Sequence, residues 1–317
     1  MQEREKSLMP KFNTIAVVGA GLIGASLAAA FKKIDPKLNI IAVDSDPETV
    51  KKAEKMGIAD RAFTEIRDNL KDAELIFVAV PISKTEAVLS QIEAGSSRSQ
   101  LIVDAGSTKK EVMQTAAEIF KKSSKRFIGG HPMAGSHNSG IDWHDPQLFE
   151  DAAFILTPLI DLPNKTDKCC CNQKNDILKS LSAQQKEDLL ALEKLILKTG
   201  AKSFIISAEE HDYCTALVSH LPHLLSSALV NLLEGEDDHT KMLELSGGGF
   251  RDMTRIAGSS PALWQDIIMS NTDNLAELLD SYIKSLEILK NELKNEDEQK
   301  IFNFLKKAAD LKKDKKS

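Results

Sequence analysis

The sequence is short of several features that would assign it to other classes of protein. Only four of its 317 residues are cysteine, and three of these, Cys169, Cys170 and Cys171, are adjacent. Adjacent cysteines cannot form an ordinary disulfide framework and lack the spacing of a zinc site. We therefore expect a protein of the reducing cytoplasm that holds no metal.

An excess of basic charge is also missing. The formal net charge is −6, and lysines gather only in the last residues, 305–317. A surface that binds nucleic acid needs a basic stripe to meet the phosphates, so nucleic acid is not an expected partner. We interpret the lysine-rich end as the solvated end of a helix.

One uncharged run has the length of a membrane span but not its character. Residues 14–31 carry no charge, yet they contain Gly19, Gly21 and Gly24 and divide into a β-rich segment and a small-residue helix. A buried strand followed by a packed helix explains the apolar composition. We therefore expect neither a membrane span nor a signal peptide.

The same run opens a dinucleotide-binding unit. A strand at 14–18 precedes the motif GAGLIG at 19–24, a helix from about 25 to 33 and a second strand at 40–43. Gly19 allows the tight turn, Gly21 lets the backbone approach a pyrophosphate, and Gly24 lets helix and strand pack closely. The start of the helix offers free N–H groups and a partial positive charge to phosphates.

Asp44 directly follows the second strand and bears on the choice of cofactor. A carboxylate at this place accepts hydrogen bonds from the adenosine ribose and repels the 2′-phosphate of NADP, while Ser45 supplies no compensating cation. We therefore predict NAD. The predicted cofactor-binding residues are Gly19, Gly21, Leu22, Ile23, Gly24, Asp44, Val80 and Pro81.

Strand and helix patterns alternate through the first two thirds of the chain. Further strands are expected at 75–80, 101–103, 127–129, 154–156 and 203–206, with helices at 83–93, 109–122 and 183–198. This alternation predicts a Rossmann-type, doubly wound and mostly parallel α/β domain over residues 1–207. Ligands of such sheets bind beyond the carboxyl ends of the strands, so Asp104, Ser107 and His131 are expected to face the nicotinamide.

Residues 208–317 show no strand pattern and predict an all-α domain. We expect a long helix at 211–233 bent by Pro222, a helix capped by Ser260, and a largely helical, long segment at 271–311. The segment has more apolar surface than one small bundle can bury, which predicts a homodimer through this domain.

Six of the seven histidines fall in two segments, GGHPMAGSHNSGIDWH at 129–144 and HDYCTALVSHLPH at 211–223. Imidazole readily moves a proton near neutral pH, so the two segments together predict one active site. His220 and His223 could instead form a metal pair, but no third ligand has suitable spacing. His144 and His211 are interpreted as structural, and His220 as a hydrogen-bonded core histidine.

These blocks, with DAGSTK at 104–109, LFEDAAFILTP at 148–158 and GGGFRDMTRIAGSSPALWQD at 247–266, closely resemble the prephenate and arogenate dehydrogenase family of tyrosine biosynthesis. The resemblance runs in order from about residue 15 to 271. Departures are the cysteine-containing stretch near 165–176 and the lack of room for the C-terminal regulatory domain of some members. It implies oxidative decarboxylation of prephenate to 4-hydroxyphenylpyruvate with reduction of NAD.

The resemblance also implies roles for individual side chains. His131 matches the catalytic histidine that hydrogen-bonds the C4 hydroxyl of the substrate, and Ser107 matches the serine that orients this hydroxyl. Arg255 matches the arginine that binds a substrate carboxylate, with Asp252 holding Arg255 or a histidine in place. The remaining matches around the substrate pocket are His223, Ser219 and Trp264. Trp264 could equally be a core side chain.

Two alternatives concern the substrate and the type of protein. Arogenate carries an ammonium group where prephenate has a keto group; His137, which we expect to face that end, is not acidic and favours prephenate. Another two-domain hydroxyacid or imine dehydrogenase would lack the two histidine segments. A dinucleotide-binding regulatory protein would need the glycine motif but not His131, Ser107 and Arg255 together.

Overall fold

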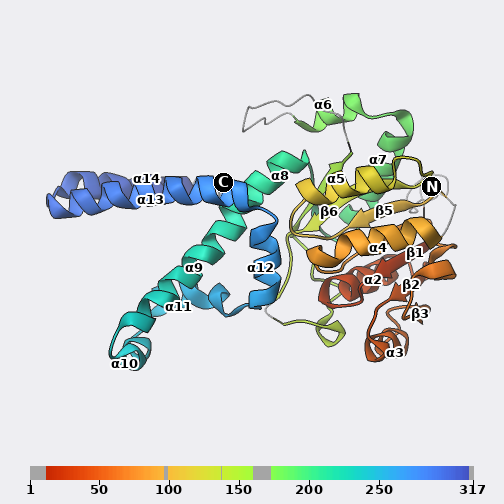
Figure 1. The fold of residues 1–317 in the computed structure, drawn as a ribbon, viewed down its shortest axis with the longest axis horizontal. Helices are drawn as coiled ribbons and strands as arrows, with labels where there is room; N and C mark the ends of the chain where they lie inside the picture. The colour runs from red at the N-terminus through yellow and green to blue at the C-terminus, as the bar shows by residue number, and fades with distance from the viewer. Residues whose placement is uncertain (1–11, 96–98, 137, 160–172, 314–317) are drawn as a thin grey trace, which may run out of the picture.

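The chain forms an eight-stranded sheet with helices on both faces, followed by a projecting helical part (Figure 1). The computed structural model describes residues 12–95, 99–136, 138–159 and 173–313. The strand order is β3-β2-β1-β4-β5-β6-β7-β8, and every neighbouring pair is parallel except β6 and β7. The predicted doubly wound, mostly parallel sheet is confirmed. The strands are β1 (Thr14–Val18), β2 (Asn39–Val43), β3 (Arg61–Phe63), β4 (Leu75–Val78), β5 (Leu101–Asp104), β6 (Arg126–Pro132), β7 (Ala153–Pro158) and β8 (Lys202–Ile205).

Two apolar cores lie on opposite faces of the sheet. Alternate residues of one strand belong to different cores, as Val17 of β1 and its neighbour Ala16 show. Helices α2 and α7 cover one face, while α4 and α5 cover the other. Because both faces are buried, the central strands are apolar throughout, which is typical of parallel sheets. The helices here are α2 (Leu22–Ile34), α3 (Pro47–Lys55), α4 (Ile82–Gly95), α5 (Lys110–Ile119), α6 (Gln173–Ser180) and α7 (Ala183–Leu197).

Strand β3 was not predicted. It has three residues, Arg61, Ala62 and Phe63, pairs only with β2, and lies at the edge of the sheet with no fully buried side chain. A strand this short carries no periodic pattern, so its pairing depends on the neighbouring strand.

The part after β8 is helical throughout its described residues, as predicted. It contains α8 (Ala208–Thr215), a π turn (Ala216–His220), α9 (Leu221–Asn231), α10 (His239–Glu244), α11 (Gly248–Thr254), α12 (Pro261–Met269), α13 (Thr272–Lys294) and α14 (Glu298–Lys313). The long segment at 271–311 is not one helix. It breaks after Lys294, where Glu296 takes a positive φ of 52°, and α13 and α14 pack side by side (Figure 1).

The predicted bent helix at 211–233 is also interrupted. Helix α8 begins at Ala208, behind Ser207, whose hydroxyl accepts the N–H of Glu210, and changes to a π turn at Ala216. Pro222, which lacks an N–H group, comes directly after the wider turn and lies in the first turn of α9. Residues 208–235 nevertheless form one continuous helical run, so the predicted long helix with Pro222 inside it is confirmed, and the π turn is the local departure from it.

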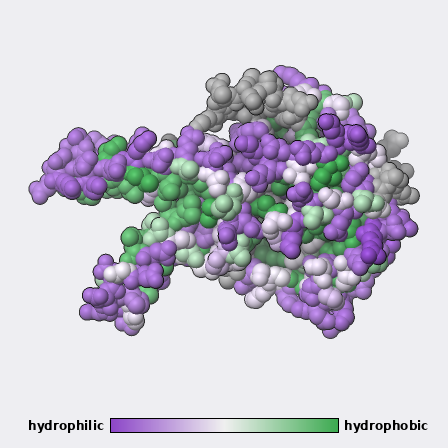
Figure 2. All heavy atoms as spheres, viewed as in Figure 1, coloured by the Kyte–Doolittle hydropathy of each residue, from purple (hydrophilic) through white to green (hydrophobic). Residues whose placement is uncertain are grey.

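The helical part buries little apolar surface within the single chain. Its core holds only Ala216, Leu221, Leu275 and Leu278, and most of the exposed large apolar side chains of the described residues lie beyond residue 208. Figure 2 shows apolar atoms along the two projecting arms. The run Ala208–Gly235 is long and apolar enough to cross a membrane by length and composition, although core helices of soluble proteins pass the same test.

Candidate active site

The glycine motif forms a turn between β1 and α2 that fits a dinucleotide. Gly19 has a φ of 92°, and a Cβ there would lie 2.4 Å from the carbonyl oxygen of Ala79. A Cβ on Gly24 would lie 1.9 Å from the carbonyl oxygen of Gly19, whereas a Cβ on Gly21 would meet no atom within 4 Å. The first and third glycines are therefore required by the protein itself. Gly21 leaves open space at the start of α2, where a pyrophosphate can approach.

Asp44 follows β2 and lies beside this turn. Its Oδ2 accepts the backbone N–H of Ala20 at 2.8 Å, and its Oδ1 accepts the N–H of Asp46 at 3.0 Å. Lys52, one of three lysines in the next helix, forms an ion pair with Asp142. The structure thus holds a carboxylate, with one nearby cation already paired, at the ribose end of the turn.

The other predicted cofactor residues lie around the same turn. Leu22 and Ile23 form the first turn of α2 and are half-buried. Val80 follows β4, and its Cγ1 would lie 3.0 Å from a Cβ on Gly19; the next residue, Pro81, is exposed. All of them therefore lie at the carboxyl ends of β1 and β4, which is where ligands of such sheets bind.

Asp104 does not face a ligand, contrary to our expectation. It is 1% exposed at the end of β5, where its Oδ1 accepts the N–H of Gly130 at 3.1 Å and its Oδ2 accepts the N–H of Gly106 at 2.9 Å. It also forms an ion pair with Lys109, whose side chain has no exposed surface. Because every partner is internal, Asp104 holds the 104–109 turn in place. Ser107, on this turn, is half-buried.

His131 lies inside β6 and not beyond its end. Parallel pairing of β6 with β5 stops at Ile128, and residues 129–132 continue the strand by antiparallel pairing with β7. The ring is 8% exposed, and its Nδ1 lies 2.8 Å from Nε2 of His211. Nε2 of His131 is therefore the ring nitrogen that remains for a substrate.

His211 and Asp212 were not predicted as site residues. Both are buried at the start of α8, and Nδ1 of His211 lies 2.7 Å from Oδ1 of Asp212. The Asp212 carboxylate also accepts the N–H of Lys109 at 2.7 Å and of Lys110 at 2.8 Å. Since α5 has no cap of its own, Asp212 caps it from the helical part of the chain.

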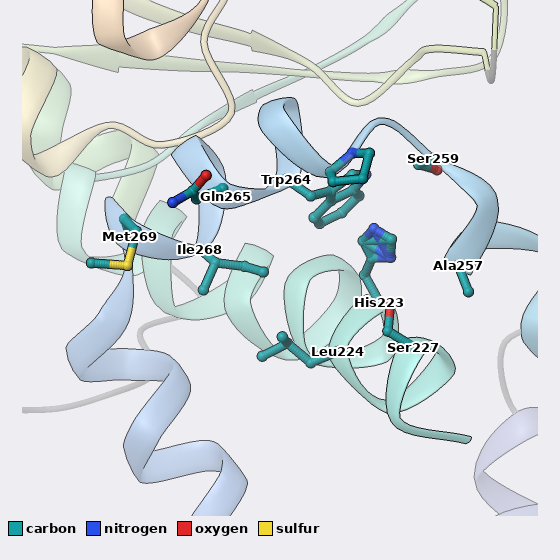
Figure 3. Close-up of a pocket in the computed structure, with 10 residues that line it drawn as sticks. His223, Leu224, Ser227, Ala257, Ser259, Trp264, Gln265, Ile268 and Met269 are labelled. Atoms are coloured by element: carbon teal, nitrogen blue, oxygen red, sulfur yellow. The ribbon is translucent and has the colours of Figure 1, made fainter. Parts of the chain in front are cut away.

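A pocket of about 370 Å3 lies between α9 and α12 (Figure 3). His223 on α9 and Trp264 on α12 meet there, with ring centroids 3.6 Å apart. Nδ1 of His223 is buried without a hydrogen-bond partner among the described residues. Such a nitrogen is suited to a bound polar ligand. The pocket lining includes neither His131 nor Ser107.

His220 lies between this pocket and His131. Its ring meets Trp264 edge-on at 6.1 Å, and its Nδ1 lies 3.3 Å from the Asn271 amide nitrogen, which also donates to the backbone carbonyl of Asp212 at 2.8 Å. His220 is therefore a hydrogen-bonded buried histidine, as predicted.

The remaining predicted substrate residues are more exposed. Ser219 is half-buried in the π turn, and Arg255 and Asp252 are exposed. Arg255 precedes the pocket-lining residue Ala257, but it forms no ion pair with Asp252 or with any other described residue. The expected support of Arg255 by Asp252 is therefore not found in this structure. His137 lies outside the described residues, as do Cys169, Cys170 and Cys171.

Burial keeps the histidines of this site neutral. It lowers the pKa of His131 and of His211 well below the ordinary value of 6.5, and the ammonium of Lys109 lowers both further. Burial also lowers the pKa of His220 to about 4 and the pKa of His223 to a lesser extent. The pKa of Asp212 is raised by burial, against the effect of the two backbone N–H groups that it accepts. A neutral His131 can accept a proton. Within the described part of the chain, no group of three or more potential ligands could hold a metal ion.

Comparison with known proteins agrees with this arrangement. The model for the prephenate dehydrogenase nucleotide-binding domain matches residues 27–187, and that for the prephenate dehydrogenase dimerization domain matches residues 207–307. Prephenate dehydrogenase of Bacillus subtilis (strain 168) is 35% identical over 300 residues, which are 94% of this chain and 75% of the relative. The chain belongs to the prephenate dehydrogenase family.

Solved structures related to this family share the whole fold. Prephenate dehydrogenase from A. aeolicus, in complex with hydroxyphenyl propionate and NAD+, is 28% identical, with a TM-score of 0.81 over 95% of this chain and 98% of that chain. Synechocystis arogenate dehydrogenase is also 28% identical, with a TM-score of 0.77 over 96% of this chain and all of that chain.

One sequence signal points to the pair His211 and Asp212, which was not predicted as part of the site. His211 and Asp212 are adjacent and follow Ser207, a residue type typical of a helix start. Their contact with α5 joins residues about a hundred positions apart, and no local pattern predicts such a contact.

Proposed function

We propose that this protein is an NAD-dependent prephenate dehydrogenase, which converts prephenate to 4-hydroxyphenylpyruvate and CO2. The observation that carries the proposal is the placement of His131. It is buried, with its pKa lowered, in β6 of the same sheet whose β1 leads into the open glycine turn, and Nε2 is the ring nitrogen left for a hydroxyl group. Membership of the prephenate dehydrogenase family supports the choice of reaction.

The glycine turn would hold the dinucleotide. Gly21 and the first turn of α2, with Leu22 and Ile23, would meet the pyrophosphate, and Asp44 would exchange its bond to the Ala20 N–H for the ribose hydroxyls. Val80 and Pro81 would flank the path toward the nicotinamide. Bound NAD supplies the acceptor for the hydride.

His131 and Ser107 would handle the C4 hydroxyl of prephenate. As the hydride leaves C4, the hydroxyl oxygen becomes a carbonyl, and Nε2 of His131 takes its proton. The electrons of the bond to the C1 carboxylate enter the ring as CO2 departs, so the ring becomes aromatic and the C4 oxygen takes the proton back from Nε2. Ser107, on the turn held by Asp104, would orient the hydroxyl.

The pocket between α9 and α12 would receive the rest of the substrate. His223, with its unpartnered Nδ1, and Trp264 line it, and Ser219 lies one turn before His223. We propose that Arg255 binds a substrate carboxylate through its planar guanidinium, with Asp252 nearby on α11. His137, which is not acidic, favours the keto group of prephenate. Arogenate is the second candidate, because a solved relative is an arogenate dehydrogenase.

We further propose a homodimer through the helical part. The boundary between the two domains would lie between residues 207 and 208, since β8 ends at Ile205 and α8 begins at Ala208. The match to a dimerization domain and the exposed apolar surface of Figure 2 support this arrangement. Burial of this surface between two copies of the chain would explain the apolar composition of Ala208–Gly235, so no membrane span is needed to explain it. We also propose a cytoplasmic location, which the biosynthetic relatives support. The net charge of −6 supports the absence of nucleic-acid partners.

The deciding experiment is NADH formation by the purified protein with prephenate or arogenate. Turnover of prephenate with NAD supports the proposal, and turnover of arogenate alone transfers it to the second candidate. Binding of NAD without turnover of either substrate would contradict it.

A further inference from the structure

Three buried side chains form one line of hydrogen bonds that leads away from the expected substrate. Nδ1 of His131 lies 2.8 Å from Nε2 of His211, and Nδ1 of His211 lies 2.7 Å from Oδ1 of Asp212. The residues are 8%, 0% and 1% exposed. Two of the three come from α8, so the line joins the helical part of the chain to β6.

The direction of these hydrogen bonds is set at the Asp212 end. Its Oδ1 accepts the N–H of Lys109, and its Oδ2 accepts the N–H of Lys110, so both oxygens are acceptors. A carboxylate can accept these two hydrogen bonds and a third from Nδ1 of His211 at the same time, which fits all the contacts of Asp212. The positive end of the α5 dipole also favours the carboxylate. Asp212 is therefore ionised, and His211 must donate to it from Nδ1.

The remaining atoms follow in turn. A neutral His211 that carries its proton on Nδ1 presents a lone pair on Nε2. His131 must then donate its own Nδ1–H to that lone pair, which leaves Nε2 of His131 without a proton. Only this tautomer can accept a proton from a substrate hydroxyl through Nε2.

We propose that His211 and Asp212 are positioning residues that hold His131 in the tautomer with the proton on Nδ1, so that Nε2 is free to act as the base. This inference rests on the proposed function, because it assigns a task to the same histidine. The proton balance is simple. The O–H bond at C4 breaks as the hydride leaves with both electrons of the C–H bond, and the proton forms a bond to Nε2. The resulting imidazolium shares its Nδ1 proton with His211, and Asp212 stabilises the charge. The proton on Nε2 returns to the C4 oxygen when the electrons of the bond to the C1 carboxylate enter the ring.

Other charged or titratable groups also face this line. Lys109 and its partner Asp104 lie on the turn that leads into α5, and His220 lies on the π turn. The Lys109–Asp104 pair has little net charge, and His220 is neutral because burial lowers its pKa to about 4. Among the residues that the structure describes, Asp212 is the one carboxylate in contact with His131 and His211, so its protonation reverses the order of donors.

A matched pair of variants at His211 separates positioning from packing. In His211→Gln, the side-chain carbonyl can still accept the Nδ1–H of His131; in His211→Leu, the volume is kept but the acceptor is lost. We expect His211→Gln to retain kcat within about tenfold. His211→Leu should lose roughly 10²–10³-fold in kcat, on the scale of a catalytic histidine in the wrong tautomer, with KM values for NAD and prephenate within about threefold. Equal losses in the two variants would overturn the proposal.

A spectroscopic measurement tests the same point without turnover. In protein labelled with ¹⁵N-histidine, the His131 signals, assigned with His131→Asn, should show a protonated Nδ1 and an unprotonated Nε2 in the wild type. Asp212→Asn, which keeps the size of the side chain, should shift His131 toward the opposite tautomer. A proton on Nε2 in the wild type would sink the proposal. Because this signal needs no substrate, its outcome is distinguishable from failure of the proposed reaction; if His211→Leu does not fold, His211→Gln and Asp212→Asn still decide.

Discussion

The ammonium of Lys109 is paired with the carboxylate of Asp104 almost out of reach of solvent, with 0% and 2% of the two side chains exposed. Asp104 also accepts the N–H groups of Gly106 and Gly130, so the pair joins the 104–109 turn to β6, one residue before His131. The position of His131 therefore depends on a buried ion pair.

Replacement of Lys109 by Met should destabilise the protein by about 3–5 kcal/mol, because Asp104 would remain buried without its cation. Urea unfolding at a fixed protein concentration measures the change. Lys51→Met is the matched control, since Lys51 pairs with Glu48 on the exposed face of α3 and its loss should leave the midpoint unchanged. A small effect of Lys109→Met would mean that water enters this site readily.

The first helix offers a pair of glycine variants with opposite outcomes. Gly24→Ala should prevent stable folding, because the new Cβ would lie 1.9 Å from the carbonyl oxygen of Gly19. Gly21→Ala meets no atom and should leave the melting temperature nearly unchanged. It should nevertheless weaken NAD binding about tenfold or more, because the methyl group occupies the approach of the pyrophosphate. Calorimetry and fluorescence titration measure the two quantities, and equal NAD affinity in Gly21→Ala and wild type would place the cofactor elsewhere.

His131→Asn should lower kcat by roughly 10²–10⁴-fold with little change in the KM for prephenate, the usual loss for a positioned base. The pH profile of the wild type provides the second measurement. Since burial lowers the pKa of His131 well below 6.5, activity should persist at pH values under 6.5 and fall only when His131 becomes protonated. A loss of merely a few-fold in the variant would remove His131 from this role.

Arg255→Ala should mainly raise the KM for prephenate, because the guanidinium would lose a substrate carboxylate while the proton chemistry at His131 remains. Arg251→Ala, one turn earlier on the exposed side of α11, serves as the control and should change neither constant. Steady-state kinetics at saturating NAD distinguish the two. An unaltered KM in Arg255→Ala would assign the carboxylate to another residue.

Stability should fall as the medium becomes mildly acidic. The folded-state pKa values of His131, His211, His220 and His223 are lowered below 6.5, so the unfolded chain binds protons first as the pH falls. Their contribution is complete above pH 6.5 and is lost below it. Asp212 has a raised pKa and acts in the opposite sense, toward pH 3.8. Urea midpoints at pH 7.5 and 5.0 should therefore differ, and His211→Gln should reduce the difference; identical midpoints in the wild type would contradict the lowered values.

The alternation of strands and helices and the dinucleotide turn were predictable because their signals are local. The glycines, Asp44 and the apolar strands each follow a short spacing rule, and the structure places Gly19, Gly24 and Asp44 around one turn. The extent of β6 was not predictable, because residues 129–132 are held by β7, which follows them. The π turn at Ala216–His220 likewise has no sequence signature beyond Pro222.

The predicted substrate residues also differ in whether a local sequence signal identifies them. His131 stood out as a histidine next to a strand end, and His223 and Trp264 meet in one pocket. The sequence indicates only a structural role for His211, because its partner His131 lies 80 positions away in the chain. The cap that Asp212 forms on α5 has no local signal either, because it joins residues 103 positions apart. Arg255 is exposed and forms no ion pair with another described residue, so its proposed role comes from the family resemblance and not from a contact within the chain.

Because Asp212 of α8 caps α5, dinucleotide binding and the protonation state of His131 would depend on different parts of the chain. The residues that we propose to bind the dinucleotide all lie before residue 82. Dinucleotide binding would therefore depend on the first domain alone. The proposed protonation state of His131 depends on both parts of the chain, because α8 of the helical part supplies His211 and Asp212. The helical part is therefore as much a component of the chemistry as of the assembly.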